Sequence, residues 1–166
     1  MMLGMSLSTF TFVHVLISLV GIASGLIVLY GFLADKRMDG LTALFLTTTV
    51  LTSVTGFMFP FEHFSPADTF GVISLIVLAI AIAARYAFHL AGGWRRTFVV
   101  TSALALYLNC FVAVVQSFLK IPALHALAPQ GKEPPFLVAQ LVVLLIFVVL
   151  TILAAKKFHV QRGHAA

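Results

Sequence analysis

The chain has 166 residues, of which 61% are hydrophobic and 9% are charged, whereas soluble domains carry about 25% charged residues. Together with a mean hydropathy of +1.13, this composition excludes a soluble globular domain and indicates a polytopic membrane protein. The formal charge of +5 does not indicate a nucleic-acid partner, because the basic residues lie at the ends of apolar runs rather than in a stripe with aromatic side chains. The expected partner is the lipid bilayer. The single cysteine, Cys110, lies inside an apolar run and forms no intrachain disulfide.

Five apolar runs predict an all-α fold, a single transmembrane domain (1–166) built as a bundle of five membrane-spanning helices. The predicted spans cover about 10–34, 41–59, 66–90, 97–119 and 136–155. The first span is long enough to cross a hydrocarbon layer of about 30 Å with some tilt. Its apolar run continues well past the length of a signal-peptide core, so we expect it to remain as a span.

The first span carries a histidine on the same helical face as small residues. His14, Ser18, Gly21 and Gly25 share that face at helical spacing. The two glycines form a small-xxx-small pair, which allows another helix backbone to approach closely. This face should therefore be packed, and His14 should point into the bundle.

The second span is rich in threonine and serine, whose hydroxyls in membrane helices bond to the helix's own carbonyls or to a neighbouring helix. We expect these hydroxyls to be structural. In the third span, Arg85 lies one to two turns inside the end. It is expected either to extend its charge to the membrane surface or to pair with Asp35 or Asp39 in the first turn.

The fourth span carries a polar stripe in an otherwise apolar segment. Ser102, Asn109, Gln116 and Lys120 recur on one helical side. Polar groups facing hydrocarbon without partners cost several kcal/mol, so the stripe must face protein, water or a ligand. A long connection, 121–135, follows without periodicity and is expected to be a loop that partly covers the stripe.

The basic residues predict the orientation, because short loops rich in Lys and Arg stay cytoplasmic. Eight of the ten lie on one side of the predicted membrane, and Lys120 and Lys132 lie on the other. The eight are Lys36, Arg37, Arg85, Arg95, Arg96, Lys156, Lys157 and Arg162. The N-terminus is therefore expected outside and the C-terminus inside (N-out/C-in).

Polar residues at the outer side then predict a ligand pocket that opens away from the cytoplasm. Its predicted members are His14, Asn109, Gln116, Lys120 and Gln140. Apolar walls with a few converging donors suit a quinone or a lipid headgroup. A metal site from His14, His63 and His125 has suitable ligand types but no recognisable spacing. A haem within the membrane is excluded, since His14 and His89 lie at opposite ends, whereas an outer haem on His14 with His63 or His125 stays open.

No catalytic motif is present, neither a Ser-His-Asp arrangement nor HExxH, GxSxG or a glycine-rich phosphate loop. We therefore name no catalytic residue and leave enzymatic activity open. Three functions remain: a module that binds a small ligand (quinone, haem or metal) or transfers electrons, an accessory or assembly subunit of a larger membrane complex, and a small oligomeric transporter.

Four short segments carry a resemblance to known proteins. They are Thr52-Ser53-Val54-Thr55-Gly56-Phe57, Ala105-Leu106-Tyr107-Leu108-Asn109, Leu127-Ala128-Pro129 and Glu133-Pro134-Pro135-Phe136. With these segments, the chain resembles small, uncharacterised five-span proteins of bacterial inner membranes. The resemblance implies a multi-pass location in the bacterial inner (cytoplasmic) membrane and no particular chemistry.

Overall fold

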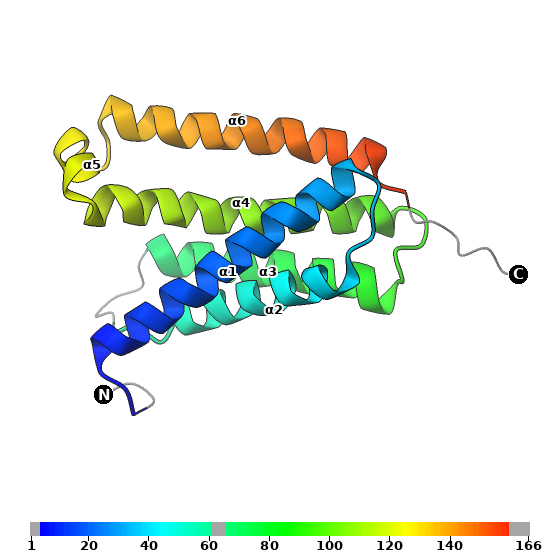
Figure 1. Ribbon diagram of the computed structural model, residues 1–166, viewed down its shortest axis with the longest axis horizontal. Helices are drawn as coiled ribbons and strands as arrows, with labels where there is room; N and C mark the ends of the chain where they lie inside the picture. Colours follow the sequence, from blue (N-terminus) through cyan, green and yellow to red (C-terminus); the bar gives the residue numbers. More distant parts are fainter. Residues whose placement is uncertain (1–3, 61–65, 160–166) are drawn as a thin grey trace, which may run out of the picture.

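The computed structural model describes residues 4–60 and 66–159, and the regular elements in these two ranges are all helices (Figure 1). This confirms the all-α class. The elements are α1 (Leu7–Leu33), α2 (Asp39–Gly56), α3 (Pro66–Ile82), the π-helix η1 (Ala83–Ala87) that continues α3, α4 (Trp94–Lys120), the short α5 (Pro122–Leu127) and α6 (Pro134–Lys157).

Four helical segments are long and apolar enough to cross a membrane, which is consistent with a membrane helix bundle. They are Leu7–Leu33, Asp68–Ala87, Trp94–Lys120 and Pro134–Lys157. The predicted second span, α2, is not among them. It has 18 residues and begins with Asp39, and its many threonines lower its hydropathy. The number of five spans therefore stays a prediction.

Helix α4 lies in the middle of the bundle, between α6 on one side and α1, α2 and α3 on the other (Figure 1). Helix α1 crosses α4 obliquely and packs most extensively on α2. The core between these helices is built largely from aromatic and aliphatic side chains. Its most buried large members are Phe45, Phe98, Phe158, Leu78 and Leu106.

The glycines of α1 permit this close packing. A Cβ on Gly25 would lie 2.6 Å from Leu106 Cδ1 and 2.8 Å from Phe45 Cδ2. Gly21 and Gly25 are both buried. The prediction that the glycine face of the first span is its packed face is therefore confirmed.

The hydroxyls of α2 bond mainly to their own helix, as expected for hydroxyl residues in membrane helices. Thr48, Thr49, Thr52, Ser53 and Thr55 each donate to the carbonyl oxygen four residues earlier, at distances of 2.7 to 3.1 Å. These bonds satisfy the hydroxyl protons within α2. The oxygen lone pairs then remain as acceptors for groups on neighbouring helices.

The predicted pairing of Arg85 with a carboxylate of the first turn is confirmed for Asp39. Arg85 Nη2 donates to Asp39 Oδ1, and Arg37 Nε lies 2.6 Å from the same oxygen. Arg85 is 6% exposed, and its guanidinium carbon lies 5.4 Å from the centre of the Phe98 ring. The arginine thus stays buried, and the carboxylate lies at the surface. Asp35 instead accepts from the backbone N–H of His159 at 2.5 Å.

The connection after α4 is not the irregular loop that we expected, since residues 122–127 form the helix α5. Pro122 occupies the first position of this helix, where its missing N–H removes no hydrogen bond. Further along, the Glu133 carboxylate accepts from the backbone N–H groups of Lys132 at 2.9 Å and Gln130 at 3.0 Å. These bonds, led by that of Lys132, hold the pKa of Glu133 below its usual value.

Candidate functional site

His14 in α1 forms a hydrogen bond between Nδ1 and Thr55 Oγ1 of α2, at 2.7 Å. The Thr55 hydroxyl also lies 2.7 Å from the carbonyl oxygen of Leu51, to which it donates. A hydroxyl has one proton, so Thr55 Oγ1 must accept from His14 Nδ1–H. The neutral imidazole is thereby held in one tautomer, with Nε2 as a hydrogen-bond acceptor.

An aromatic wall holds the imidazole in place. The Phe59 ring meets it edge to face, with ring centres 5.2 Å apart, and meets Phe10 in the same way at 5.1 Å. His14 itself is half-buried. Within 4–60 and 66–159, no residue bonds to its Nε2. The histidine therefore presents a fixed, accessible acceptor beside aromatic rings.

Lys120 is the last residue of α4, and the end of α4 lies on the same side of the bundle as the start of α1, which carries His14 (Figure 1). The side chain of Lys120 is exposed, as is that of Gln116 one turn earlier. The end of α2 lies at this end of the bundle as well (Figure 1). This end combines an acceptor, His14 Nε2, with a cationic donor, Lys120 Nζ.

Asn109 lies deeper in the bundle, about 16 Å from Lys120 along the helix at 1.5 Å per residue. A Cβ on Gly21 would lie 3.2 Å from Thr48 Oγ1, 3.3 Å from Thr49 Oγ1 and 3.4 Å from Asn109 Nδ2. Three polar side chains from α2 and α4 thus surround the α1 backbone at Gly21. Asn109 is 9% exposed, and its Nδ2 has no hydrogen-bond partner among the described residues. The structure places Asn109 in a packed helix contact.

Gln140 is buried at the contact between α4 and α6. Its Nε2 donates to the carbonyl oxygen of Phe111 at 3.2 Å, while its buried Oε1 has no partner in the part of the chain that the structure describes. Positions 109 and 111 are two residues apart, so they point to different sides of α4. The five predicted pocket residues are therefore distributed over three places: His14 with Lys120 and the exposed Gln116, Asn109 alone, and Gln140 alone.

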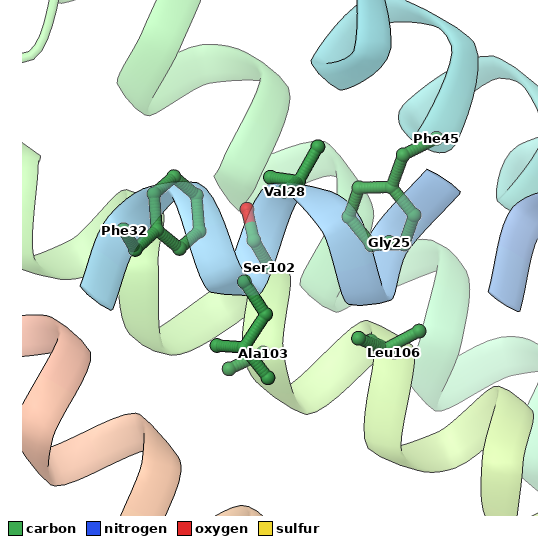
Figure 2. A pocket seen from close by; sticks show the side chains of 8 residues that line it. Gly25, Val28, Phe32, Phe45, Ser102, Ala103 and Leu106 are labelled. Carbon is green, nitrogen blue, oxygen red and sulfur yellow. The ribbon is translucent and has the colours of Figure 1, made fainter. Parts of the chain in front are cut away.

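A small void lies between α1, α2 and α4, and it contains one polar side chain, that of Ser102 (Figure 2). Ser102 is 2% exposed. The rings of Phe32 and Phe45 flank the void. The void is too small to admit a water molecule. It is a gap in helix packing and offers no space for a ligand.

The predicted metal ligands are only partly within the described residues. His125 lies exposed on α5, and His63 lies outside the described residues. Within the described ranges, no three His, Cys, Asp or Glu side chains are gathered closely enough to hold a metal ion. The set of His14, His63 and His125 includes His63, and the outer haem needs His63 or His125 beside His14, so both stay predictions.

Sequence reasoning included His14 in the pocket but missed Thr55 as its partner. The available signal was the antiparallel hairpin, because a residue near the start of α1 must lie beside one near the end of α2. Thr55 is one of seven hydroxyl residues in α2, and nothing in the sequence distinguished it from the other six. Phe59 was missed as a contact of the imidazole for the same reason.

The fold and this site define a class: a helical membrane bundle with a histidine of fixed tautomer at one end. No family model, no curated protein and no solved structure matches the chain. The resemblance to small five-span proteins of bacterial inner membranes therefore stays a prediction.

Proposed function

We propose that the chain is a five-span protein of the bacterial inner membrane, with its N-terminus outside and its C-terminus inside. Helix α2 supports the fifth span, since its 18 residues reach about 27 Å at 1.5 Å per residue, and it lies along α1 (Figure 1). The charges support the orientation. Lys36, Arg37, Arg95, Lys156 and Lys157 are at the end opposite His14, and such ends remain cytoplasmic.

We further propose that the outer end binds the hydroxylated ring of a quinol. The observation that carries this proposal is the open Nε2 of His14, held as an acceptor by the bond to Thr55. A quinol hydroxyl donates to such a nitrogen, and the ammonium of Lys120 donates to the second oxygen of the ring. The Phe59 ring supplies an apolar surface, and the lipid accommodates the isoprenoid tail.

Quinol is preferred to metal and haem on the basis of ligand number. A metal needs about four ligands, of which a catalytic site takes three from protein, and the outer haem predicted from the sequence needs His63 or His125 beside His14 as its axial ligands. Among the described residues, no three His, Cys, Asp or Glu side chains gather closely enough to hold a metal ion. A quinol needs only one acceptor and one donor beside an apolar wall, and these are the groups that His14, Lys120 and Phe59 provide.

Titration calorimetry of the detergent-purified protein with a short-chain quinol tests the proposal. His14→Asn should weaken binding about tenfold, because it removes one hydrogen bond to a polarised group. Thr55→Val should weaken quinol binding by a smaller factor, because the imidazole of His14 is then no longer held in one tautomer. Thr55→Ser keeps the hydroxyl and should bind quinol as the wild type does. The matched control is His89→Asn at the other end, where φ is +48° and asparagine tolerates that backbone.

The redox form of the ligand gives a second criterion. The quinone has carbonyl oxygens and no hydroxyl, so it cannot donate to an acceptor nitrogen. The reduced form should therefore bind more tightly than the oxidised form in the wild type, and His14→Asn should remove this preference. Equal binding of quinol by wild type and His14→Asn would refute the proposal.

A second candidate function, an accessory subunit of a membrane complex, is favoured by the position of α6. This helix has 24 residues, of which only Gln140, Phe147 and Ala154 are buried, and most of its Leu, Val and Ile side chains are exposed. A partner helix would cover these side chains in place of lipid. In that case His14→Ala would leave function in the cell intact, whereas Gly21→Leu or Gly25→Leu, which distort the bundle, would abolish it.

A further inference from the structure

Four basic residues gather where α4 begins and α6 ends, at the end of the bundle opposite His14 (Figure 1). Arg95 Nη1 lies 3.5 Å from the carbonyl oxygen of Ala155, which places the first turn of α4 beside the last turn of α6. Arg96 follows Arg95 in the chain, and Lys156 and Lys157 follow Ala155. The two neighbouring helix ends therefore carry four cations.

The acidic residues at this end of the described chain are engaged elsewhere. Asp39 accepts from Arg37 and Arg85. Asp35 accepts from the backbone N–H of His159, and its other oxygen lies 3.7 Å from the His159 ring nitrogen. The first turn of α4 contains no acidic residue. Counting the residues that the structure places, the four cations have no ion-pair partner and are available to an external anion.

Exposed apolar residues continue from these cations along the helices. Val100 is 44% exposed and lies four residues after Arg96, and Leu153 is 41% exposed and lies four residues before Lys157. Residues four apart lie on the same helix face. Trp94, 37% exposed, marks the level of the membrane interface. Charge at the interface with apolar surface below it matches the arrangement of a phospholipid.

We infer that the start of α4 and the end of α6 bind an anionic phospholipid. The phosphate accepts hydrogen bonds from Arg95 and Arg96, whose planar guanidinium groups suit phosphate geometry, and Lys156 and Lys157 add charge. At the first turn of α4, the N–H group of Trp94 donates to the carbonyl oxygen of Ala91, and the N–H groups of Arg95 and Arg96 favour the same negative group. The acyl chains lie along the faces of Val100 and Leu153. A free phosphate ion would use the cations alone.

The experiment compares lipid binding by the full chain in detergent. Native mass spectrometry counts bound phosphatidylglycerol and phosphatidylcholine at equal added concentrations. The first variant replaces all four cations by glutamine, as Arg95→Gln, Arg96→Gln, Lys156→Gln and Lys157→Gln. The matched control replaces the cations of the other end, as Lys120→Gln and Lys132→Gln.

Each cation near a membrane surface contributes about a fivefold factor to anionic lipid binding. The variant with all four substitutions should therefore retain no phosphatidylglycerol, whereas the control should retain as much as the wild type. If the variant with four substitutions fails to fold, the double variant Arg96→Gln with Lys157→Gln takes its place. It changes only exposed side chains and should weaken phosphatidylglycerol binding about 25-fold.

Three results would overturn the inference. The first is that the wild type retains as much phosphatidylcholine as phosphatidylglycerol, and the second is that the Lys120 and Lys132 control loses as much phosphatidylglycerol as the variant at the other end. The third is thermal stabilisation by inorganic phosphate as large as that by phosphatidylglycerol. The last would identify an ion site without a lipid. Because the protein is in micelles and no quinol is added, the outcome depends neither on the orientation in the membrane nor on quinol binding.

Discussion

Replacing Asp39 by asparagine tests how the buried Arg85 is stabilised. Arg85 is 6% exposed and its Nε lacks a hydrogen-bond partner in the described structure. Its charge is balanced by Asp39, whose side chain is 61% exposed. Asparagine keeps the shape and one acceptor oxygen but removes the negative charge. The guanidinium would then remain buried without a counter-ion.

The expected loss follows from the exposure of the two partners. Removing one partner of a fully buried pair costs about 3–5 kcal/mol. Here water reaches the carboxylate and asparagine still accepts one bond, so we expect Asp39→Asn to lower the free energy of unfolding by about 1–3 kcal/mol. Arg37 contacts the same carboxylate from an exposed position, and Arg37→Gln should cost only about 0.2–1 kcal/mol.

Equilibrium unfolding of the protein in mixed micelles, with increasing sodium dodecyl sulfate, measures these differences. Adding Arg85→Met to Asp39→Asn should recover most of the loss, because it removes the uncompensated buried charge. Two results would refute the reasoning. One is an Asp39→Asn loss no larger than that of Arg37→Gln, and the other is a double variant no more stable than Asp39→Asn alone.

Three further predictions concern helix packing, the buried amide and the loop carboxylate. Gly25→Ala should lower the free energy of unfolding by about 1–3 kcal/mol, whereas Gly40→Ala, whose Cβ would meet nothing within 4 Å, should be neutral or slightly stabilising in the same assay. Asn109→Leu should change the stability by less than about 1.5 kcal/mol, because the amide that it removes has an unpaired Nδ2; a large loss would show that this group has a partner. Glu133 has a lowered pKa, so its bonds to the loop amides are fully present above its ordinary pKa of 4.5 and are lost as the pH falls through its lower folded value. The protection factor of the Gln130 amide, which is the intrinsic exchange rate divided by the observed rate, should fall over that range in the wild type, and in Glu133→Gln it should be low at every pH.

The sequence alone was sufficient for the all-α class and for four helices long and apolar enough to cross a membrane, because both follow from the long apolar runs. It was also sufficient for features that depend on one helix or on neighbouring helices. The packed face of Gly21 and Gly25 follows from helical spacing. The pairing of Arg85 with the first turn was one of two outcomes that the cost of a charge in lipid predicts. It was not sufficient for α5, because six residues carry too little periodicity to distinguish a short helix from a loop.

Only the tertiary structure decided which polar residues meet. The polar stripe lies on one face of α4, yet Asn109 packs against Gly21 while Lys120 is exposed at the helix end, because α1 crosses α4 obliquely and covers only part of that face. Gln140 joins α4 from its other side. The spacing of residues along one helix predicts only the face on which each side chain lies. The crossing angles and offsets between helices, which bring Thr55 to His14, come from the packing of all the helices together.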